Sequence, residues 1–196
     1  MARNTRKSSL EVLVFVAASA VFGAQGAEFR PLVKAGVDFG GDTMVTAVFS
    51  DGFTEEVRAN DGFYIGGGAV IIDNARNMEY HLTLAYKFAS IDGTDGDIEW
   101  SRIPLEALAF YRFSRVRLGG GLTYHINPRL EGDGSAGGLD VEDFKNALGV
   151  VLQADWRVNQ MIGVGARYTI LEYDAEGAFF GSAKSNGVGV TLSINF

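Results

Sequence analysis

The sequence predicts an all-β protein, an eight-stranded antiparallel β-barrel with an extra hairpin in its first long connection. The first observation is that the last nine residues alternate between large apolar and small or polar side chains, which places the two kinds on opposite faces of a strand. The apolar members of this pattern are Val188, Val190, Leu192, Ile194 and Phe196. The second observation is that seven earlier segments alternate in the same way, and the third is that short turns and long polar connections alternate between them.

The N-terminal residues 1–26 have the organisation of a cleaved secretory signal. Three positive charges precede an apolar segment over 12–22, and the small residues of Ala24-Gln25-Gly26 form a cleavage site. Cleavage after Ala27 is an alternative. An uncleaved anchor helix is the other alternative, but the apolar segment is shorter than the roughly 18 to 20 residues that a spanning helix needs.

The composition fits one globular domain, residues 27–196, after the signal. The chain has 196 residues, 47% of them hydrophobic, with 26 glycines, 3 prolines and no cysteine, so no disulfide forms. Removal of Arg3, Arg6, Lys7 and Glu11 with the signal changes the formal charge to −7 − 2 = −9. Nucleic acid is therefore not an expected partner, because phosphate binding needs a basic surface. No later apolar run reaches helix-spanning length, so the mature chain would cross a membrane only as strands.

The first predicted strand covers about 31–41 and separates apolar from charged residues cleanly. Its odd-numbered positions are apolar, whereas Lys34 and Asp38 lie on the opposite face. The following long connection contains a predicted hairpin over 44–58, because Asp51-Gly52 is a strong turn signal between two strand-like segments.

Two strands are predicted over 62–73 and 78–90, joined by a short turn. Three glycines at 66–68 make the facing of the first strand ambiguous, and we assign Phe63, Ile65, Ala69 and Ile71 to its outer face. The second strand alternates most clearly. Its apolar face consists of Met78, Tyr80, Leu82, Leu84, Tyr86 and Phe88.

The next two strands are predicted over 99–113 and 116–127, with a tight turn at Ser114-Arg115. The Asp- and Gly-rich segment 92–97 is expected to be a loop. Pro104 has no N–H to donate to a strand pair, so it indicates a bulge or a locally irregular stretch.

The last three strands are predicted over 144–158, 161–173 and 187–196. The polar segments 128–142 and 174–184 form the connections on the long-loop side. Longer links therefore alternate with short turns near 74–77, 114–115 and 158–160. This alternation is typical of barrels with short turns on one side and long loops on the other.

The polar faces of these strands contain nearly balanced charges, which predict a polar network inside the barrel. Such a network requires paired charges, because a buried ion without a partner is costly. The candidate lumen residues are Lys34, Asp38, Glu79, His81, Lys87, Glu106, Arg112, Arg117, His125, Asp155, Arg157 and Arg167. Alternation by itself does not tell which face meets water, so a soluble barrel with an apolar interior remains an alternative.

The mature chain resembles the small outer-membrane β-barrel proteins of the eight-stranded type, similar to the OmpA transmembrane domain, OmpX and OmpW. The resemblance covers the whole mature chain and rests on the signal, the strand rhythm and the terminal pattern Val188–Phe196. It implies a transmembrane barrel in the outer membrane of a Gram-negative envelope, exported through a Sec-type signal peptide. It also implies assembly by the barrel-insertion machinery, which reads the terminal pattern. We further expect contact with membrane lipid and lipopolysaccharide, and a monomeric state.

We expect a structural or interaction role in the envelope, without enzymatic activity, cofactor or metal. Outer-membrane lipid A deacylases carry a serine two places after the histidine, where this chain has Asn127 after His125. The acidic segments 92–97 and 131–134 lack the twelve-residue pattern of a calcium loop. One alternative is a narrow porin-like channel for small solutes through the polar lumen, and a second is a secreted soluble β-barrel that binds a small ligand. A broken pairing in the lumen would favour the channel, and a continuous salt-bridge network would favour the structural role.

Overall fold

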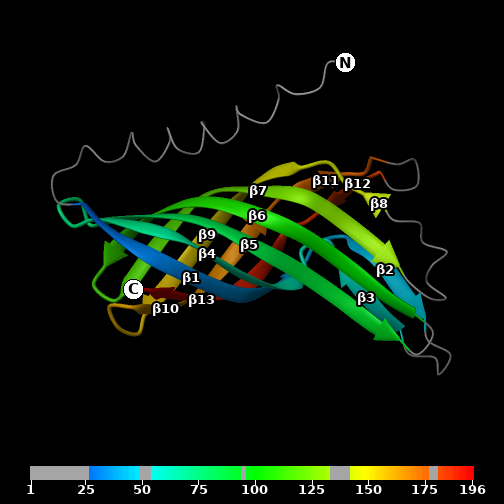
Figure 1. Cartoon of the computed structure of the whole chain (residues 1–196), viewed down its shortest axis with the longest axis horizontal. Helices are drawn as coiled ribbons and strands as arrows, with labels where there is room; N and C mark the ends of the chain where they lie inside the picture. Colours follow the sequence, from blue (N-terminus) through cyan, green and yellow to red (C-terminus); the bar gives the residue numbers. More distant parts are fainter. Residues whose placement is uncertain (1–26, 49–53, 94–95, 133–141, 177–180) are drawn as a thin grey trace, which may run out of the picture.

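The computed structural model describes residues 27–48, 54–93, 96–132, 142–176 and 181–196, and it confirms the predicted all-β barrel (Figure 1). The barrel strands are β1 (Ala27–Gly40), β4 (Gly62–Asp73), β5 (Met78–Gly93), β6 (Gly96–Phe113), β7 (Val116–Gly132), β9 (Ala147–Arg157), β10 (Ile162–Ile170) and β13 (Gly187–Asn195). The shorter strands are β2 (Thr43–Val48), β3 (Thr54–Arg58), β8 (Glu142–Asp143), β11 (Glu172–Asp174) and β12 (Ser182–Lys184). The described residues include no helix long and apolar enough to cross a bilayer.

The eight barrel strands form a closed antiparallel cylinder. Each strand pairs with its neighbours in the order β6-β5-β4-β1-β13-β10-β9-β7, and β6 also pairs with β7, which closes the ring. The predicted hairpin is present as the separate β2–β3 pair, and β11 and β12 form a second small sheet. The turn of the predicted hairpin, at 50–52, lies outside the described residues.

The register of the strand pairs determines the shape of the barrel. Starting from Asp73 and following the paired residues once around the barrel ends at Phe63 of the same strand, a shift of 73 − 63 = 10 residues. The path passes through Met78, Tyr111, Leu118, Ala154, Ala166, Val190 and Val37. With a rise of about 3.3 Å per residue and a strand spacing of about 4.8 Å, this shift implies a strand tilt of roughly 41°. An eight-stranded barrel of this kind has an interior that side chains fill.

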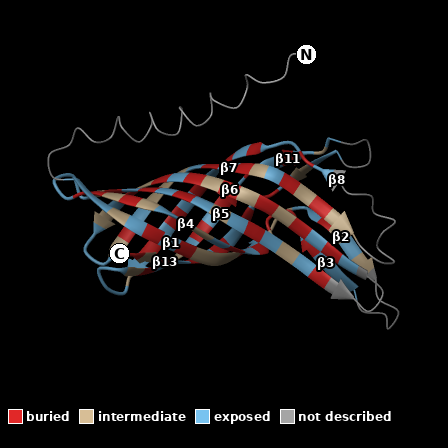
Figure 2. Ribbon diagram, viewed as in Figure 1, coloured by how far each residue is buried: buried red, intermediate tan, exposed pale blue. Residues whose placement is uncertain are grey.

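Burial alternates along each strand, with the apolar face outward (Figure 2). In β4, Phe63 and Ile65 are 63% and 61% exposed, whereas Tyr64 and Val70 are buried, as predicted for this strand. The inward position of Gly36 on β1 is filled by the ring of Tyr64, its paired residue on β4. The apolar faces of the described strands are thus on the outside of the barrel, and the polar faces are inside it.

Several strands extend further than the sequence predicted, on the long-loop side. β5 runs to Gly93 and β6 begins at Gly96, so most of the predicted loop 92–97 is strand, and β7 continues to Gly132. The inward residues of these extensions are apolar and pack together, which stabilises strand structure where Asp-Gly pairs indicated a loop. The strand predicted over 161–173 instead ends at Ile170, and Glu172–Asp174 pairs with β12.

The inward residues of the extensions pack with residues of the β2–β3 hairpin, β9, β11 and adjoining segments in an apolar cluster that we call the apolar cap. Its members are Met44, Val57, Ala59, Ile91, Ile98, Trp100, Leu130, Phe144, Ala147, Leu171 and Tyr173. Trp100 lies at its centre, with ring centroids 5.3 Å from both Phe144 and Tyr173, and its indole N–H donates to the carbonyl oxygen of Ala59 at 3.0 Å. The β2–β3 hairpin is therefore folded onto the long-loop end of the barrel rather than extended away from it.

Candidate functional site: the interior of the barrel

Charged side chains form a layer of the barrel interior that extends from the short turns toward the apolar cap. They lie on β1, β5, β6, β7, β9 and β10, at inward positions of the two-residue period. We call the buried members the lumen network: Lys34, Asp38, Glu79, His81, Lys87, Glu106, Arg117, Gln153, Asp155 and Arg167.

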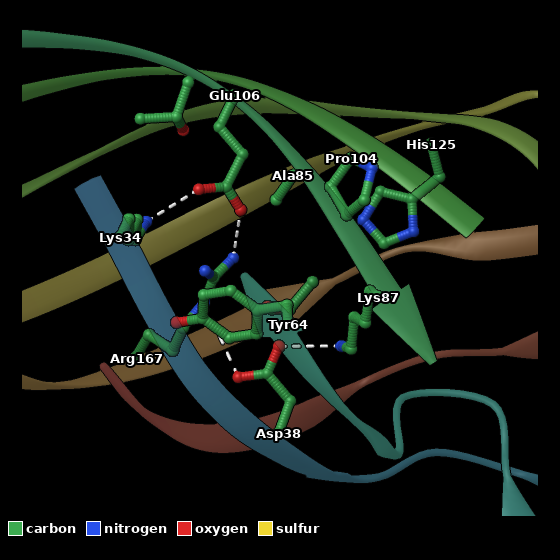
Figure 3. Close-up of a pocket in the computed structure, with 11 residues that line it drawn as sticks. Lys34, Asp38, Tyr64, Ala85, Lys87, Pro104, Glu106, His125 and Arg167 are labelled. Carbon is green, nitrogen blue, oxygen red and sulfur yellow. Dashed lines mark hydrogen bonds and ion pairs between the residues drawn. The ribbon is translucent and has the colours of Figure 1, made fainter. Parts of the chain in front are cut away.

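Glu106 is the centre of one half of the lumen network (Figure 3). Its carboxylate accepts from Lys34 Nζ at 2.7 Å and from the guanidinium of Arg167. Arg167 Nε also lies 3.7 Å from Asp38 Oδ1, and the other oxygen of Asp38 accepts from Lys87 Nζ at 2.7 Å. Two carboxylates thus alternate with three cations across the barrel.

Arg117 is the centre of the other half. It donates to Glu79 at 2.6 Å and to Asp155 at 2.7 Å, and it also donates to the hydroxyl of Ser193 at 2.8 Å. The amide of Gln153 connects the halves, since it donates to Asp155 at 2.8 Å and accepts from Lys34 at 3.4 Å. The lumen network is therefore continuous from Lys87 to Glu79.

Apolar side chains cover the lumen network at one end and pack beside it. The apolar cap covers it toward the long loops. Two further buried clusters face inward beside the network, one of Leu32, Val70 and Ile72 and one of Leu108, Phe110 and Val151. Phe110 is the strand partner of Glu79, and Val70 is the strand partner of His81. Phe110 also packs against the network, with Arg117 5.1 Å from its ring centroid and His81 4.7 Å from it.

Arg102 lies at the junction of the lumen network and the apolar cap. It is 1% exposed, donates to the carbonyl oxygen of Asp61 at 2.6 Å and lies 5.0 Å from the ring centroid of Trp100. Nearby, the hydroxyl of Tyr173 contacts Nδ1 of His125, and burial raises the pKa of this hydroxyl above its usual value. Within the described residues, Arg102 has no carboxylate in ion-pair distance, so it adds a positive charge beside the network.

The free space in the charged layer is small. A cavity of about 10 Å³ lies among Asp38, Tyr64, Glu106, His125 and Arg167. Figure 3 shows the side chains that line it. This volume holds about one water molecule. Side chains therefore fill the charged layer around this cavity.

The structure places the sequence-predicted residues as follows. Ten of the twelve candidate lumen residues are buried, whereas Arg112 and Arg157 are half-buried at the short-turn end, 3.7 and 3.9 Å from Glu79. Four of the five members of the C-terminal pattern are exposed on the outer face and Ile194 is half-buried, and the role of the pattern in assembly stays a prediction.

The interior residues that the candidate set lacked include Arg102, Gln153 and Tyr64. The sequence does contain a signal for Arg102 and Gln153, because each is separated by an even number of positions from inward-facing residues on the same strand, Glu106 and Asp155. Tyr64 lies beside the glycines that made its strand ambiguous, and only its pairing with Gly36 shows that it fills the interior.

The described residues contain no group of three or more histidine, cysteine or acidic side chains placed to hold a metal ion. His81 contacts Glu79 at 3.4 Å, and His125 contacts Tyr173. Neither histidine has a serine among the hydrogen-bond partners that the described structure gives it.

The fold is that of small outer-membrane β-barrels. Neisserial surface protein A has a TM-score of 0.51 and 17% identity over 88% of this chain and 100% of its own. Ail, the attachment invasion locus protein of Yersinia pestis, solved in complex with the heparin analogue sucrose octasulfate, has a TM-score of 0.56 and 11% identity over 88% of this chain and 100% of its own. At these identities the similarity concerns the fold. No protein-family description matches the sequence, and no curated protein matches it.

Proposed function

We propose that this chain is an integral outer-membrane β-barrel protein with a closed interior and a structural or interaction role in the bacterial envelope. The observation that carries the proposal is the combination of an apolar outer surface with a polar interior that its own side chains fill. The expected export signal, the barrel-insertion machinery, lipid and lipopolysaccharide as partners, and the monomeric state are parts of the same proposal.

The outer surface supports a membrane location. Among the residues that the structure describes, 28 large hydrophobic side chains are exposed, including Leu148 at 65% and Phe63 at 63%. Soluble proteins rarely expose contiguous apolar surface beyond a few hundred Å². Strands β9, β10 and β13 have 11, 9 and 9 residues, close to the roughly 9–11 that cross a bilayer when tilted.

Aromatic residues stand at both edges of this apolar surface, where the headgroup layers would lie. Phe39, Phe63 and Phe88 occupy the long-loop edge. Tyr111, Phe113, Trp156 and Phe196 occupy the short-turn edge. Aromatic girdles of this kind are typical of membrane barrels. The similarity in fold to two outer-membrane proteins supports the same location.

The interior supports a closed barrel rather than a channel. An ion crossing it would have to separate the pairs of the lumen network and then pass the apolar cap. Leaving one member of a buried ion pair without its partner costs about 3–5 kcal/mol. The cavity beside Asp38 and Arg167, of about 10 Å³, is too small to be a route around these pairs. Interactions of the protein would then take place on its outer surface and at its long-loop end.

Two measurements on the protein extracted from cell envelopes test this proposal. We expect detergent-dependent solubility and a mobility difference between boiled and unboiled samples on a denaturing gel, since folded membrane barrels resist unfolding in detergent. In planar bilayers we expect no stable conductance steps. Steady conductance would favour the narrow channel, whereas recovery in the soluble periplasmic fraction would favour the ligand-binding soluble barrel.

A further inference from the structure

The short-turn end of the barrel carries an excess of arginine. The arginines at this end are Arg30, Arg76, Arg112, Arg115 and Arg157. The acidic residues there are Glu28, which pairs with Arg30 at 2.9 Å, and Asp73, which pairs with Arg76 at 2.8 Å. Glu79 lies deeper, 3.7 and 3.9 Å from Arg112 and Arg157, but it is already paired with Arg117 at 2.6 Å. Positive charge therefore remains, and it is concentrated on the two turns that carry Arg115 and Arg157.

These two turns form a hollow of about 320 Å³, which we call the rim hollow. It is lined by Ser114, Arg115, Arg157, Val158, Asn159 and Gln160. Arg157 joins the turns, because its backbone N–H donates to the carbonyl oxygen of Arg115 at 2.7 Å and its guanidinium donates to the carbonyl oxygen of Ser114. The side chain of Asn159 accepts from the N–H groups of Met161 and Ile162 at 2.7 Å each, which holds the second turn in shape.

Arg115 is the available cation of the rim hollow. It is exposed, and within the described part of the chain its side chain has no hydrogen bond or ion pair. A guanidinium recognises a phosphate or carboxylate by two parallel hydrogen bonds, which gives both strength and orientation. The rim hollow can thus bind an anionic group without breaking an existing pair of Arg115.

The rim hollow opens beside the apolar outer surface. Val158 is 56% exposed, and Phe113 and Trp156, on the strands that lead into the two turns, are 53% and 54% exposed. An anionic group here would be within reach of apolar chains packed against these side chains. A cation at the edge of the apolar outer surface matches a phospholipid. The phosphate of such a lipid lies in the headgroup layer, beside the cation, and its acyl chains lie in the apolar layer, beside the outer surface.

We propose that the rim hollow binds the headgroup of an anionic phospholipid in the leaflet next to the short turns, with Arg115 as the principal phosphate ligand. This inference rests on the proposed membrane location. It adds a defined lipid site at the end of the barrel opposite the long loops, where the hairpin and most of the exposed acidic residues of the described chain lie.

Tryptophan fluorescence tests the proposal, because the chain has two tryptophans and they report on different places. Trp156 is exposed next to the rim hollow, whereas Trp100 is fully buried in the apolar cap. The full chain is reconstituted in phosphatidylcholine vesicles that contain a minority of brominated phosphatidylglycerol or the same fraction of brominated phosphatidylcholine. Bromine quenches tryptophan on contact, so the ratio of quenching gives the relative affinity for the two headgroups. The variant Trp156→Phe should lose the response.

We expect brominated phosphatidylglycerol to quench Trp156 more strongly than brominated phosphatidylcholine. Arg115→Gln should reduce the relative affinity about fivefold, the factor for one basic residue near an anionic surface, and Arg115→Glu should abolish the preference. The matched control is Lys145→Gln, which removes one exposed charge at the opposite end and should leave the ratio unchanged. Heat modifiability confirms that each variant is folded.

The outcomes separate the two proposals. Equal quenching by both lipids would show a membrane barrel without the headgroup site. A preference that persists in both Arg115 variants would place the site elsewhere, and a preference that inorganic phosphate removes, where chloride at equal ionic strength does not, would show a general phosphate site. Each of these results overturns the lipid proposal alone. Absence of quenching by either lipid overturns the membrane location, and with it the lipid site.

Discussion

Glu106→Gln is the substitution that tests the lumen network most directly. Glu106 is 5% exposed and is shared by two cations, Lys34 at 2.7 Å and Arg167. Glutamine has nearly the same shape and keeps an acceptor oxygen, so the packing of the interior is conserved while the negative charge is removed. The substitution therefore measures the charge rather than the volume of the side chain.

The general cost of an unpaired buried charge sets the range of the effect, and the contacts that remain decide where in that range it lies. Leaving a buried ion without its partner costs about 3–5 kcal/mol. Both cations keep part of their contacts, because Arg167 still lies 3.7 Å from Asp38 and Lys34 lies 3.4 Å from Gln153. We therefore expect about 3 kcal/mol, which lowers the folding equilibrium constant on the order of 100-fold.

Equilibrium unfolding in urea with detergent micelles measures this cost. Heat modifiability and tryptophan fluorescence monitor the folded fraction. Glu99→Gln is the matched control, since it makes the same chemical change on the same strand at an exposed residue, and it should change the free energy of unfolding by less than about 0.5 kcal/mol. If Glu106→Gln is as stable as the control, the carboxylate does not hold the two cations and the argument for a closed charged interior fails.

Three further substitutions test other parts of the barrel. Gly36→Ala should destabilise it by about 1–3 kcal/mol, because a Cβ would meet the ring of Tyr64 and the backbone of the adjacent strand, and an unchanged urea midpoint would contradict this packing. Trp100→Ala should cost about 3–5 kcal/mol by opening the centre of the apolar cap, and bilayer recordings show whether that layer also blocks ions, in which case the variant conducts and the parent does not. The hydrogen bond from Arg76 lowers the pKa of Asp73, so this carboxylate stabilises the fold above the ordinary carboxyl pKa of about 4 and ceases to do so once acid protonates it. Asp73→Asn should accordingly lower the urea midpoint at pH 7 and match the parent at a pH low enough to protonate the carboxyl.

Local pattern was sufficient for the strands and their two faces. A strand has a side-chain period of two, so each alternating segment in the sequence separates its apolar from its polar residues without reference to the rest of the chain. The division of 78–90 and of the C-terminal segment into an apolar and a polar face follows from this period alone. The extra hairpin was likewise predictable, because its turn signal is local.

The lengths of the strands were less predictable on the long-loop side. Asp-Gly pairs near 92–97 indicate turns, but Ile91, Ile98 and Trp100 extend the strands because they pack against the β2–β3 hairpin. This packing joins residues that are far apart in the sequence. For example, the hydrogen bond from Trp100 to Ala59 spans 41 positions. No window of neighbouring residues contains that information.

The sequence by itself determined that this chain forms eight amphipathic strands with balanced charges on their polar faces, because alternation and composition are local properties. Only the tertiary structure decided that the apolar faces point outward, that Lys34 meets Glu106 across 72 positions, and that an apolar cap covers the lumen network. The physical reason is closure: the ten-residue register shift around the ring sets which inward side chains lie at the same height, and charges can pair only there.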